Sequence, residues 1–291
     1  MEDRWSVFLG RAERLMERVE SLLAERIREP HWEDSIAFRY RRRRSNQAEI
    51  VAVPRLQAIG LQDLKAIDDQ RERIRRNTEQ FVRGSCANNV LLTGARGTGK
   101  SSLVRACLQA FAGQGLRLIE VDKTDLVDLP DIVEVLSQRP ERFVIFCDDL
   151  SFDEGESGYK ALKSVLDGSI AATSENVLVY ATSNRRHLMP EYMADNHSSI
   201  QSPQGEVHPG EAVEEKVSLS ERFGLWVSFY PFSQDEYLRI VRQWLQALNV
   251  PDDQWDVARP KALIWALERG SRSGRVAMQF ARDFAGQQRL A

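Results

Sequence analysis

The sequence predicts an α/β protein in which helices sandwich a parallel sheet, with a small all-helical unit at its C-terminal end. Beyond Gly84, short runs of β-branched and other apolar residues alternate with helical patterns. Strands buried on both faces read as continuous apolar runs, and strand–helix alternation implies parallel strands joined by right-handed crossovers. From Ser233 onward the pattern is only helical, over residues 234–248, 259–269 and 275–288.

Length and composition agree with this fold class. At roughly 100 to 200 residues per domain, 291 residues allow two compact units or one larger unit with an appendage. The 42% hydrophobic and 29% charged residues exclude a disordered or collagen-like chain. The 40 Lys and Arg nearly balance the 43 Asp and Glu, so the net charge of -3 does not indicate a nucleic-acid binder. No secretory signal or apolar run of ~20 residues is visible, so we expect a cytoplasmic protein without a membrane partner.

Residues 1–60 are expected to form a helical extension. Apolar residues recur at spacings of three and four over residues 5–28, which predicts an amphipathic helix that docks on its own domain, on a second subunit or on a partner. After this helix, Tyr40 and the run from Arg41 to Arg44 could grip the phosphates of DNA or RNA. Basic runs are more often solvated tethers or contacts to acidic surfaces, so nucleic-acid binding stays a secondary hypothesis.

Residues 61–231 are expected to form the α/β domain, with five strands. The sequence predicts the strands at residues 90–93, 116–121, 143–147, 177–182 and 225–230. Helical patterns cover residues 61–83, 100–112, 126–137 and 159–166, and a short β-like run at 50–53 falls in the extension. Residues 187–210 contain few large apolar side chains and are expected to form a long loop. Residues 232–291 are expected to form the separate helical domain.

A glycine-rich loop joins the first of these strands to the next helix. From Gly94 to Ser101 it reads GARGTGKS and matches G-x-x-x-x-G-K-[ST], which arises by chance in a chain of this length on the order of once in a hundred sequences. The glycines let main-chain N–H groups point at phosphates, Lys100 supplies a positive charge, and the Ser101 hydroxyl is a ligand for Mg2+. A predicted strand directly before the loop and a predicted helix directly after it make a chance match much less probable. We therefore predict a nucleotide-phosphate site formed by Gly94, Ala95, Arg96, Gly97, Thr98, Gly99, Lys100, Ser101 and Ser102.

Two acids follow the strand at 143–147 and supply the second half of such a site. Asp148 and Asp149 would lie at the carboxyl edge of the sheet, where ligands of open α/β folds bind. Acids after a strand are often only turn or N-cap residues, but these two are separated from the glycine-rich loop by one strand–helix unit. We expect Asp148 to hold Mg2+, through water, and Asp149 to orient or deprotonate the attacking water.

Together these residues resemble AAA+ ATPases, and more narrowly a bacterial family described only as a domain of unknown function. The narrower resemblance rests on the segments ANNVLL, FCDDLSF, ATSNRRHL, LSERFGL and RSGR, in chain order. It covers residue 61 to the C-terminal end and is weak over the first 60 residues. The resemblance implies a five-stranded parallel sheet sandwiched by helices, a C-terminal helical lid over residues 232–291, and ATP and Mg2+ as cofactors.

The resemblance also implies roles for three residues outside the loop and the acids. Asn184 corresponds to sensor 1, which helps to position the water, although a strand-end turn residue would look the same. Arg222 resembles the arginine finger that reaches the nucleotide of a neighbouring subunit, which implies a homo-oligomer; the alternative is a surface salt bridge. Arg275 resembles sensor 2, through which the lid contacts the γ-phosphate, with Arg272 as the alternative.

The sequence departs from the AAA+ pattern in two places. Many AAA+ enzymes carry Glu where this chain has Asp149, and a shorter acid favours slow turnover. Residues 122–128, after the second predicted strand, contain no aromatic residue, which argues against threading of polypeptides.

The leading hypothesis is therefore a Mg2+-dependent ATPase that couples lid motion to the remodelling or loading of a macromolecular partner, with a protein favoured over DNA. Two alternatives stay open. One is a nucleotide-switched binding module with little hydrolysis, which Asp149 would permit. The other is a P-loop small-molecule kinase, for which the sequence identifies no acceptor pocket.

Overall fold

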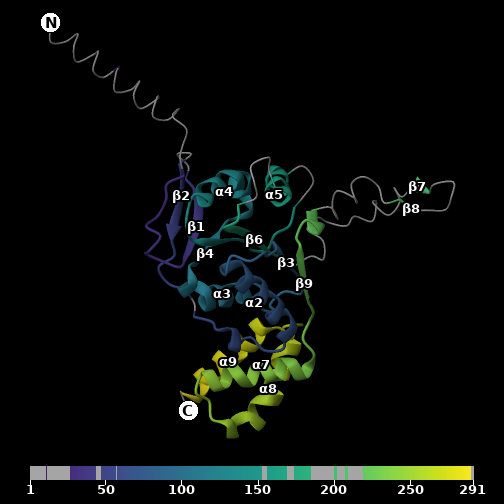
Figure 1. Cartoon of the computed structure of the whole chain (residues 1–291). Helices are drawn as coiled ribbons and strands as arrows, with labels where there is room; N and C mark the ends of the chain where they lie inside the picture. The colour runs from purple at the N-terminus through teal and green to yellow at the C-terminus, as the bar shows by residue number, and fades with distance from the viewer. Residues whose placement is uncertain are drawn as a thin grey trace.

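The computed structural model describes residues 27–43, 47–56, 58–152, 156–168, 174–184 and 219–289, together with residues 11, 200–201 and 207–208. In this part of the chain a seven-stranded sheet lies between two layers of helices, and three further helices lie below them in the view of Figure 1. None of the described helices is long and apolar enough to cross a membrane.

The sheet has the strand order β2-β1-β4-β5-β6-β3-β9. All neighbouring strands are parallel except β2, which runs antiparallel to β1 at one edge. The strands are β1 (Ala37–Arg42), β2 (Ala48–Ala52), β3 (Val90–Gly94), β4 (Leu116–Glu120), β5 (Arg142–Cys147), β6 (Val177–Ser183) and β9 (Leu225–Phe229). The five strands predicted from the sequence are β3, β4, β5, β6 and β9, and they form one continuous parallel block.

The sheet has two strands more than the five predicted, because it continues into the segment expected to form a helical extension. β1 pairs with β4, and β2 closes that edge of the sheet. β1 alternates buried Phe38 and Tyr40 with exposed Arg39 and Arg41, which is the period of two expected of a strand with one buried face. The arginines make this alternation hard to recognise in the sequence.

Three arginines in and beside β1 are ion-paired. The pairs are Arg39 with Glu120 (3.1 Å), Arg42 with Asp128 (2.5 Å) and Arg43 with Glu49 (2.8 Å). Asp128 is only 5% exposed and also accepts a hydrogen bond of 2.8 Å from the Tyr40 hydroxyl. Asp128 is the last residue of the 3-10 helix η3 (Lys123–Asp128), so these contacts join β1 to the segment that follows β4. Arg44 lies outside the described residues.

Two pairs of helices cover the two faces of the sheet. α2 (Asp68–Val82) and α3 (Lys100–Phe111) share one buried apolar cluster with one face, and α4 (Leu129–Ser137) and α5 (Ser157–Asp167) share a second cluster with the other face. Short 3-10 helices precede α2 (η1, Leu61–Asp63) and follow α3 (η2, Ala112–Gln114). The helical patterns predicted in this part of the sequence correspond to these elements.

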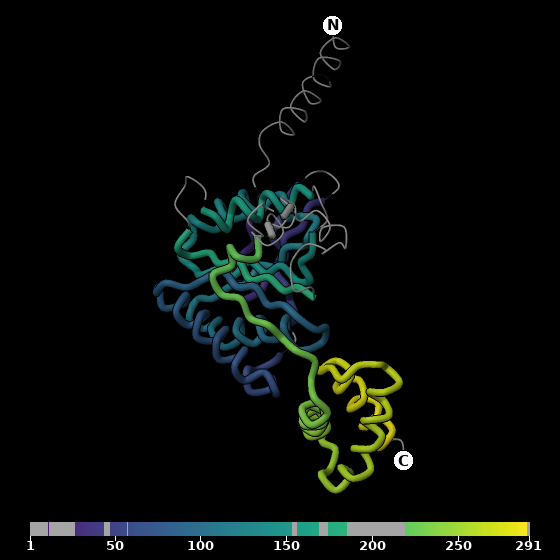
Figure 2. Tube along the Cα trace, turned by 90° about the vertical axis from the view of Figure 1, so that its right-hand side faces the viewer, coloured from purple at the N-terminus to yellow at the C-terminus, as the bar shows by residue number. Residues whose placement is uncertain are grey.

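The C-terminal helices form the lid. They are α7 (Gln234–Ala247), α8 (Trp255–Glu268) and α9 (Gly274–Gln288), with the 3-10 helix η5 (Asp252–Gln254) before α8. Ser233 and Glu236 form a capping box that fixes the start of α7. The lid follows the carboxyl end of β9 (Figure 2). Its core side chains Tyr237, Val241 and Phe280 belong to the same apolar cluster as α2 and α3.

Two predicted segments fall mostly outside the described residues. In the predicted helix at 5–28 the structure describes only Arg11, which is helical, Ile27 and Arg28. In the predicted loop at 187–210 it describes β7 (Ile200–Gln201) and β8 (Val207–His208), which pair antiparallel as a short hairpin.

The contact between β1 and η3 can be tested with Tyr40→Phe. This substitution removes one donor from the buried carboxylate of Asp128, so we expect a loss of about 1–3 kcal/mol in the free energy of unfolding, measured by urea titration. Tyr230→Phe is the matched control because Tyr230 is 73% exposed, and a change within about 0.5 kcal/mol is expected there. Equal urea midpoints of unfolding for the two variants would show that the Tyr40 hydroxyl contributes nothing to stability.

Candidate functional site

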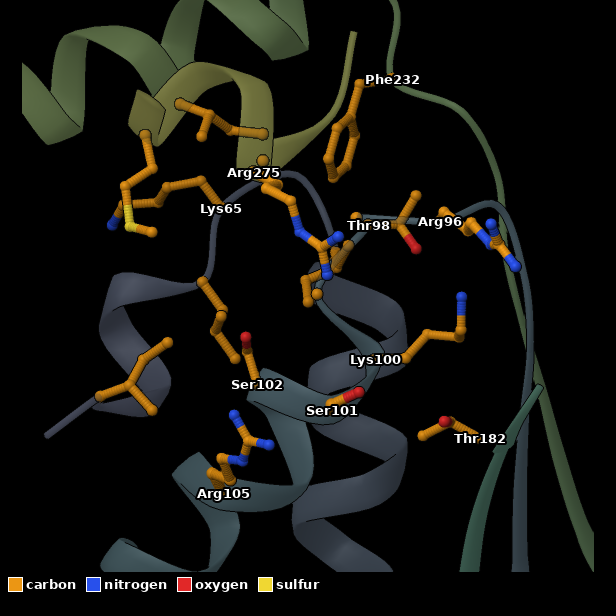
Figure 3. A pocket seen from close by; sticks show the side chains of 18 of the residues that line it. Lys65, Arg96, Thr98, Lys100, Ser101, Ser102, Arg105, Thr182, Phe232 and Arg275 are labelled. Carbon is orange, nitrogen blue, oxygen red and sulfur yellow. The ribbon is translucent and has the colours of Figure 1, made fainter. Parts of the chain in front are cut away.

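A cavity of about 530 Å³ opens at the carboxyl ends of the central strands (Figure 3). It is lined by the loop between β3 and α3, by the segment at 59–67, by the acids after β5, and by side chains of α7 and α9. Most of the predicted site residues lie there: Arg96, Gly97, Thr98, Gly99, Lys100, Ser101, Ser102, Asp148, Asp149, Asn184 and Arg275. Gly94, Ala95, Arg222 and Arg272 are not among the residues that line it.

The loop between β3 and α3 has a backbone that favours glycine. Gly94, Gly97 and Gly99 have φ angles of +117°, +72° and +100°, in the left-handed region that costs other residues energy. At Gly94 the backbone of β9 is so close that a Cβ would lie 1.9 Å from the carbonyl oxygen of Phe229. Gly99 is the N-cap of α3, so the loop delivers Lys100 directly to the start of the helix.

Lys100 is held inside the loop and is only 6% exposed. Its Nζ donates to the carbonyl oxygens of Gly94 and Ala95, both at 2.8 Å, and to Oδ1 of Asn184 at 3.1 Å. Burial lowers the pKa of the Lys100 ammonium, and the nearby carboxylates of Asp148 and Asp149 oppose this shift. Among the described residues the ammonium therefore has only neutral hydrogen-bond acceptors, in a place where an anionic ligand would favour its charge.

The two acids are tied to the loop and to the end of β6. The Ser101 hydroxyl donates to Oδ1 of Asp148 at 2.6 Å. Nδ2 of Asn184 donates to Oδ1 of Asp149 at 2.5 Å, so Asn184 joins Lys100 to the second acid. The structure thus brings the loop, the acids and the sensor 1 candidate into one hydrogen-bonded group.

The cavity also has an apolar wall that was not predicted from the sequence. This wall combines the segment before α2 with side chains of the lid and consists of Ile59, Leu64, Ile67, Phe232, Ile240, Trp244 and Met278. The main-chain N–H of Ile59 donates to Oε1 of Gln109 at 3.1 Å, which fixes the segment against α3. In the sequence, the apolar wall could be recognised only by the spacing of Ile59, Leu64 and Ile67. That spacing cannot be told apart from the helical pattern predicted from residue 61. Thr182 and the cations Lys65 and Arg105 line the cavity too and were not predicted either.

The lid reaches the loop in two ways. Arg275 extends from the start of α9 into the cavity between Lys65 and Thr98, as Figure 3 shows. The main-chain N–H of Gly274 also donates to the carbonyl oxygen of Gly97 at 2.8 Å. Of the two candidates for sensor 2, Arg275 is therefore the one that lies in the cavity.

Arg222 lies apart from this cavity. Its Nε is 2.5 Å from Oδ1 of Asp167 at the end of α5, and this pair is the salt bridge that was the alternative to an arginine finger. Within its own chain Arg222 does not reach the site, so a role in hydrolysis would require a second subunit.

The fold can now be compared with solved structures. The parallel sheet, the glycine-rich loop before α3 and the helical unit after β9 are arranged as in the AAA+ fold. Solved AAA+ structures align with the chain at low identity and show the shared fold.

A point mutant of RuvB from Thermotoga maritima aligns with a TM-score of 0.51 and 16% identity over 78% of this chain and 65% of its own. The AAA domain of FIGL-1 in complex with ADP aligns with a TM-score of 0.50 and 19% identity over 79% and 74%. Orc1 of Aeropyrum pernix in complex with DNA aligns with a TM-score of 0.54 and 16% identity over 81% and 67%.

The family model for "Protein of unknown function (DUF815)" matches residues 33–288, and the chain belongs to that family. The match begins at residue 33, so it includes β1 and β2, where the sequence resemblance is weak. The chain spans slightly less than two thirds of the length of the RuvB chains, 63% and 65% in two of them. No curated protein matches the chain.

The contact between the lid and the loop can be tested with Gly97→Ala. A Cβ there would lie 2.8 Å from Cβ of Ser273, and its φ of +72° costs an alanine about 1–2 kcal/mol. We expect the unfolding free energy to fall by about that amount and the amide of Gly274 to exchange its hydrogen faster. Gly113→Ala is the control because a Cβ at Gly113 meets nothing within 4 Å. Equally slow Gly274 exchange in both variants would contradict the contact.

Proposed function

We propose that the chain is a Mg2+-dependent ATPase that binds ATP between its α/β domain and its lid. In this proposal, hydrolysis drives lid motion that remodels or loads a macromolecular partner. The observation that carries the proposal is that one cavity collects the glycine-rich loop, both acids, Asn184 and Arg275 from distant parts of the chain.

Phosphate binding is proposed for residues 94–102. Glycines with positive φ let consecutive main-chain N–H groups face one ligand at the positive end of α3. Lys100 would exchange its carbonyl partners for phosphate oxygens, and this exchange offsets the desolvation that lowers its pKa. Arg275 would add a second positive charge from the lid side.

The residues beside the loop fit Mg2+. The Ser101 hydroxyl and the Asp148 carboxylate are hard oxygen donors 2.6 Å apart. The described residues contain no cluster of three or more His, Cys, Asp or Glu that could hold a metal alone. This is expected for a magnesium site that uses one carboxylate, waters and substrate phosphates. When bound, Mg2+ would neutralise charge on the β- and γ-phosphates.

Hydrolysis requires a water aligned with the γ-phosphorus. We assign its orientation to Asp149, whose carboxylate is held by Asn184. The oxygen of this water forms the new bond to phosphorus, the bond to the β-phosphate oxygen breaks, and ADP and phosphate leave. A proton from the water passes to the carboxylate or to phosphate. The shorter acid at 149 favours a low rate.

The apolar wall is proposed to hold the purine base. Ile59, Leu64 and Ile67 offer an apolar surface on one side, and Phe232 and Trp244 offer aromatic surface from the lid side. The ADP in the FIGL-1 structure supports an adenine nucleotide here. Residues 37–231 and 232–291 would then act as the two moving units, with the first enlarged from its expected start at residue 61 because β1 and β2 belong to the sheet.

We propose a protein partner in the cytoplasm rather than DNA. The pairing of Arg39, Arg42 and Arg43 with acids of the same chain supports this choice, because those acids partly neutralise charges that would otherwise face phosphates. The DNA in the Orc1 structure is the main argument for the alternative. Arg222 would join copies of the chain into a homo-oligomer.

Nucleotide binding can be tested with Lys100→Ala. Loss of a charge-assisted contact of about 1.5–3 kcal/mol should weaken ATP binding, measured by calorimetry with Mg2+, by roughly ten- to a hundredfold and abolish hydrolysis. Lys160→Ala, on the exposed face of α5, should change neither ATP binding nor hydrolysis.

Asp149→Asn should keep ATP binding and lose hydrolysis. Absence of ATP binding by the wild type would end the proposal, and phosphate release only with an added acceptor would indicate a kinase.

The role of Arg222 can be tested by mixing copies. Arg222→Ala should lower hydrolysis by about 10³-fold or more while ATP affinity stays unchanged. A mixture of Arg222→Ala and Lys100→Ala copies should regain hydrolysis, because Lys100→Ala copies can supply the arginine to the intact loops of the other copies. Arg282→Ala, an exposed arginine of α9, should behave as wild type. A mixture as inactive as its components would exclude a finger that acts between subunits.

A further inference from the structure

Thr182 lies between the two acids of the site. It is near the carboxyl end of β6 and only 2% exposed, and Figure 3 shows it beside Ser101 and below Lys100. Its hydroxyl donates to Oδ1 of Asp148 at 2.6 Å and accepts from the main-chain N–H of Asp149 at 2.9 Å. One hydroxyl group thus contacts both acidic residues.

The hydrogen count of this hydroxyl leaves no ambiguity about its orientation. A threonine hydroxyl has one proton, and an ionised carboxylate can only accept, so the proton must point to Asp148. A lone pair then faces the N–H of Asp149. Oδ1 of Asp148 also accepts from Ser101, and Oδ2 accepts no hydrogen bond from the residues that the structure describes. The two hydroxyl donors therefore turn one oxygen of Asp148 inward and leave the other for a ligand.

Thr182 also fixes the turn that carries the second acid. Its carbonyl oxygen accepts from the main-chain N–H of Leu150 at 2.6 Å, so its main chain and side chain hold two successive amides. Between these contacts Asp149 adopts a φ of +54°, in the left-handed region that disfavours most residues but accommodates Asp and Asn comparatively well. This conformation points the carboxylate of Asp149 at Asn184. The turn thus favours a short acid at this position.

We propose that Thr182 is a positioning residue that sets the orientation of both acids through one hydroxyl group. It acts on Asp148 by a hydrogen bond to the carboxylate and on Asp149 by fixing the backbone of the turn. The inference rests on the proposed function for its consequence in metal binding and hydrolysis, while its structural part concerns the ligand-free protein alone.

The test compares Thr182→Val with Thr182→Ser. Valine keeps the β-branched shape that suits a strand and replaces the hydroxyl with a methyl group, whereas serine keeps the hydroxyl and loses the methyl group. Thr93→Val is the matched control. Thr93 is also 2% exposed, at the end of neighbouring β3, but its hydroxyl accepts from Nε1 of Trp226 and contacts neither acid.

The first measurement is amide hydrogen exchange in the ligand-free protein, followed by NMR. We expect the Asp149 amide to exchange on the order of tenfold or more faster in Thr182→Val and close to the wild-type rate in Thr182→Ser and Thr93→Val. An unchanged Asp149 amide in Thr182→Val would overturn the inference whether or not the protein binds ATP.

The second measurement is binding of Mn2+, used in place of Mg2+, with a non-hydrolysable ATP analogue, followed by electron paramagnetic resonance. Thr182→Val should weaken Mn2+ binding by roughly ten- to a hundredfold, and its affinity for the analogue in EDTA should stay within about twofold of wild type. Hydrolysis should lose kcat with little change in KM for ATP, and Thr182→Ser should restore it.

These outcomes separate positioning from general destabilisation and from failure of the proposed function. If Thr182→Val lost both affinity for the analogue and stability, the substitution would have disrupted the fold in general, and that result would contradict a positioning role. Thr93→Val shows how much of such a loss a buried threonine elsewhere in the sheet causes. Thr182→Ser as impaired as Thr182→Val would also contradict a positioning role. A wild type that binds no nucleotide refutes the proposed function, and the Asp149 amide then decides the structural part alone.

Discussion

The close approach of the loop after β3 to strand β9 is the constraint on which the rest of the site depends. At Gly94 there is no room for a side chain, and the next amide, Ala95 N–H, donates to the Phe229 carbonyl at 3.2 Å. This contact sets where the loop begins, and the positive φ angles of the later glycines carry the chain to the first turn of α3. β9 then leads directly into the helical lid, whose first helix, α7, begins at Gln234.

Strand register does the rest of the assembly. In the parallel block Cys147 lies opposite Ala181, and Leu92 lies opposite Thr182, so β3, β5 and β6 all end at one level. Polar residues placed directly after each strand therefore meet without any long-range loop having to deliver them. On the far side of β4, Tyr40 and Arg42 anchor η3 through Asp128. The segment at 123–128, which contains no aromatic residue, is thereby tied to an added strand of the sheet.

Local patterns predicted most of the fold and the part of the candidate site that lies on the glycine-rich loop and directly after β5. Residues 94–101 and Asp148 could be found because glycines, a lysine and strand-end acids have fixed places relative to neighbouring elements. The apolar wall could not be found in this way, since Ile59 and Trp244 meet only after α7 packs on the segment before α2. β1 was missed because arginines alternate with its buried residues and because its stabilising acid, Asp128, is distant in sequence. Thr182 gave no signal, since a buried threonine in a strand is usually a packing residue.

The lid contacts the loop through its main chain as well as through Arg275, and the two contacts differ in what they can transmit. Arg275 can respond only to a charge that enters the cavity. The hydrogen bond from Gly274 N–H to the Gly97 carbonyl responds to the orientation of the loop peptide itself. If loop N–H groups turn toward phosphates, the carbonyls of the same peptides turn with them, because each peptide unit is planar. If the loop binds phosphate as proposed, such a turn would change the partner that α9 has on the loop even without Arg275, so the main-chain contact offers a route from site to lid that does not depend on that arginine.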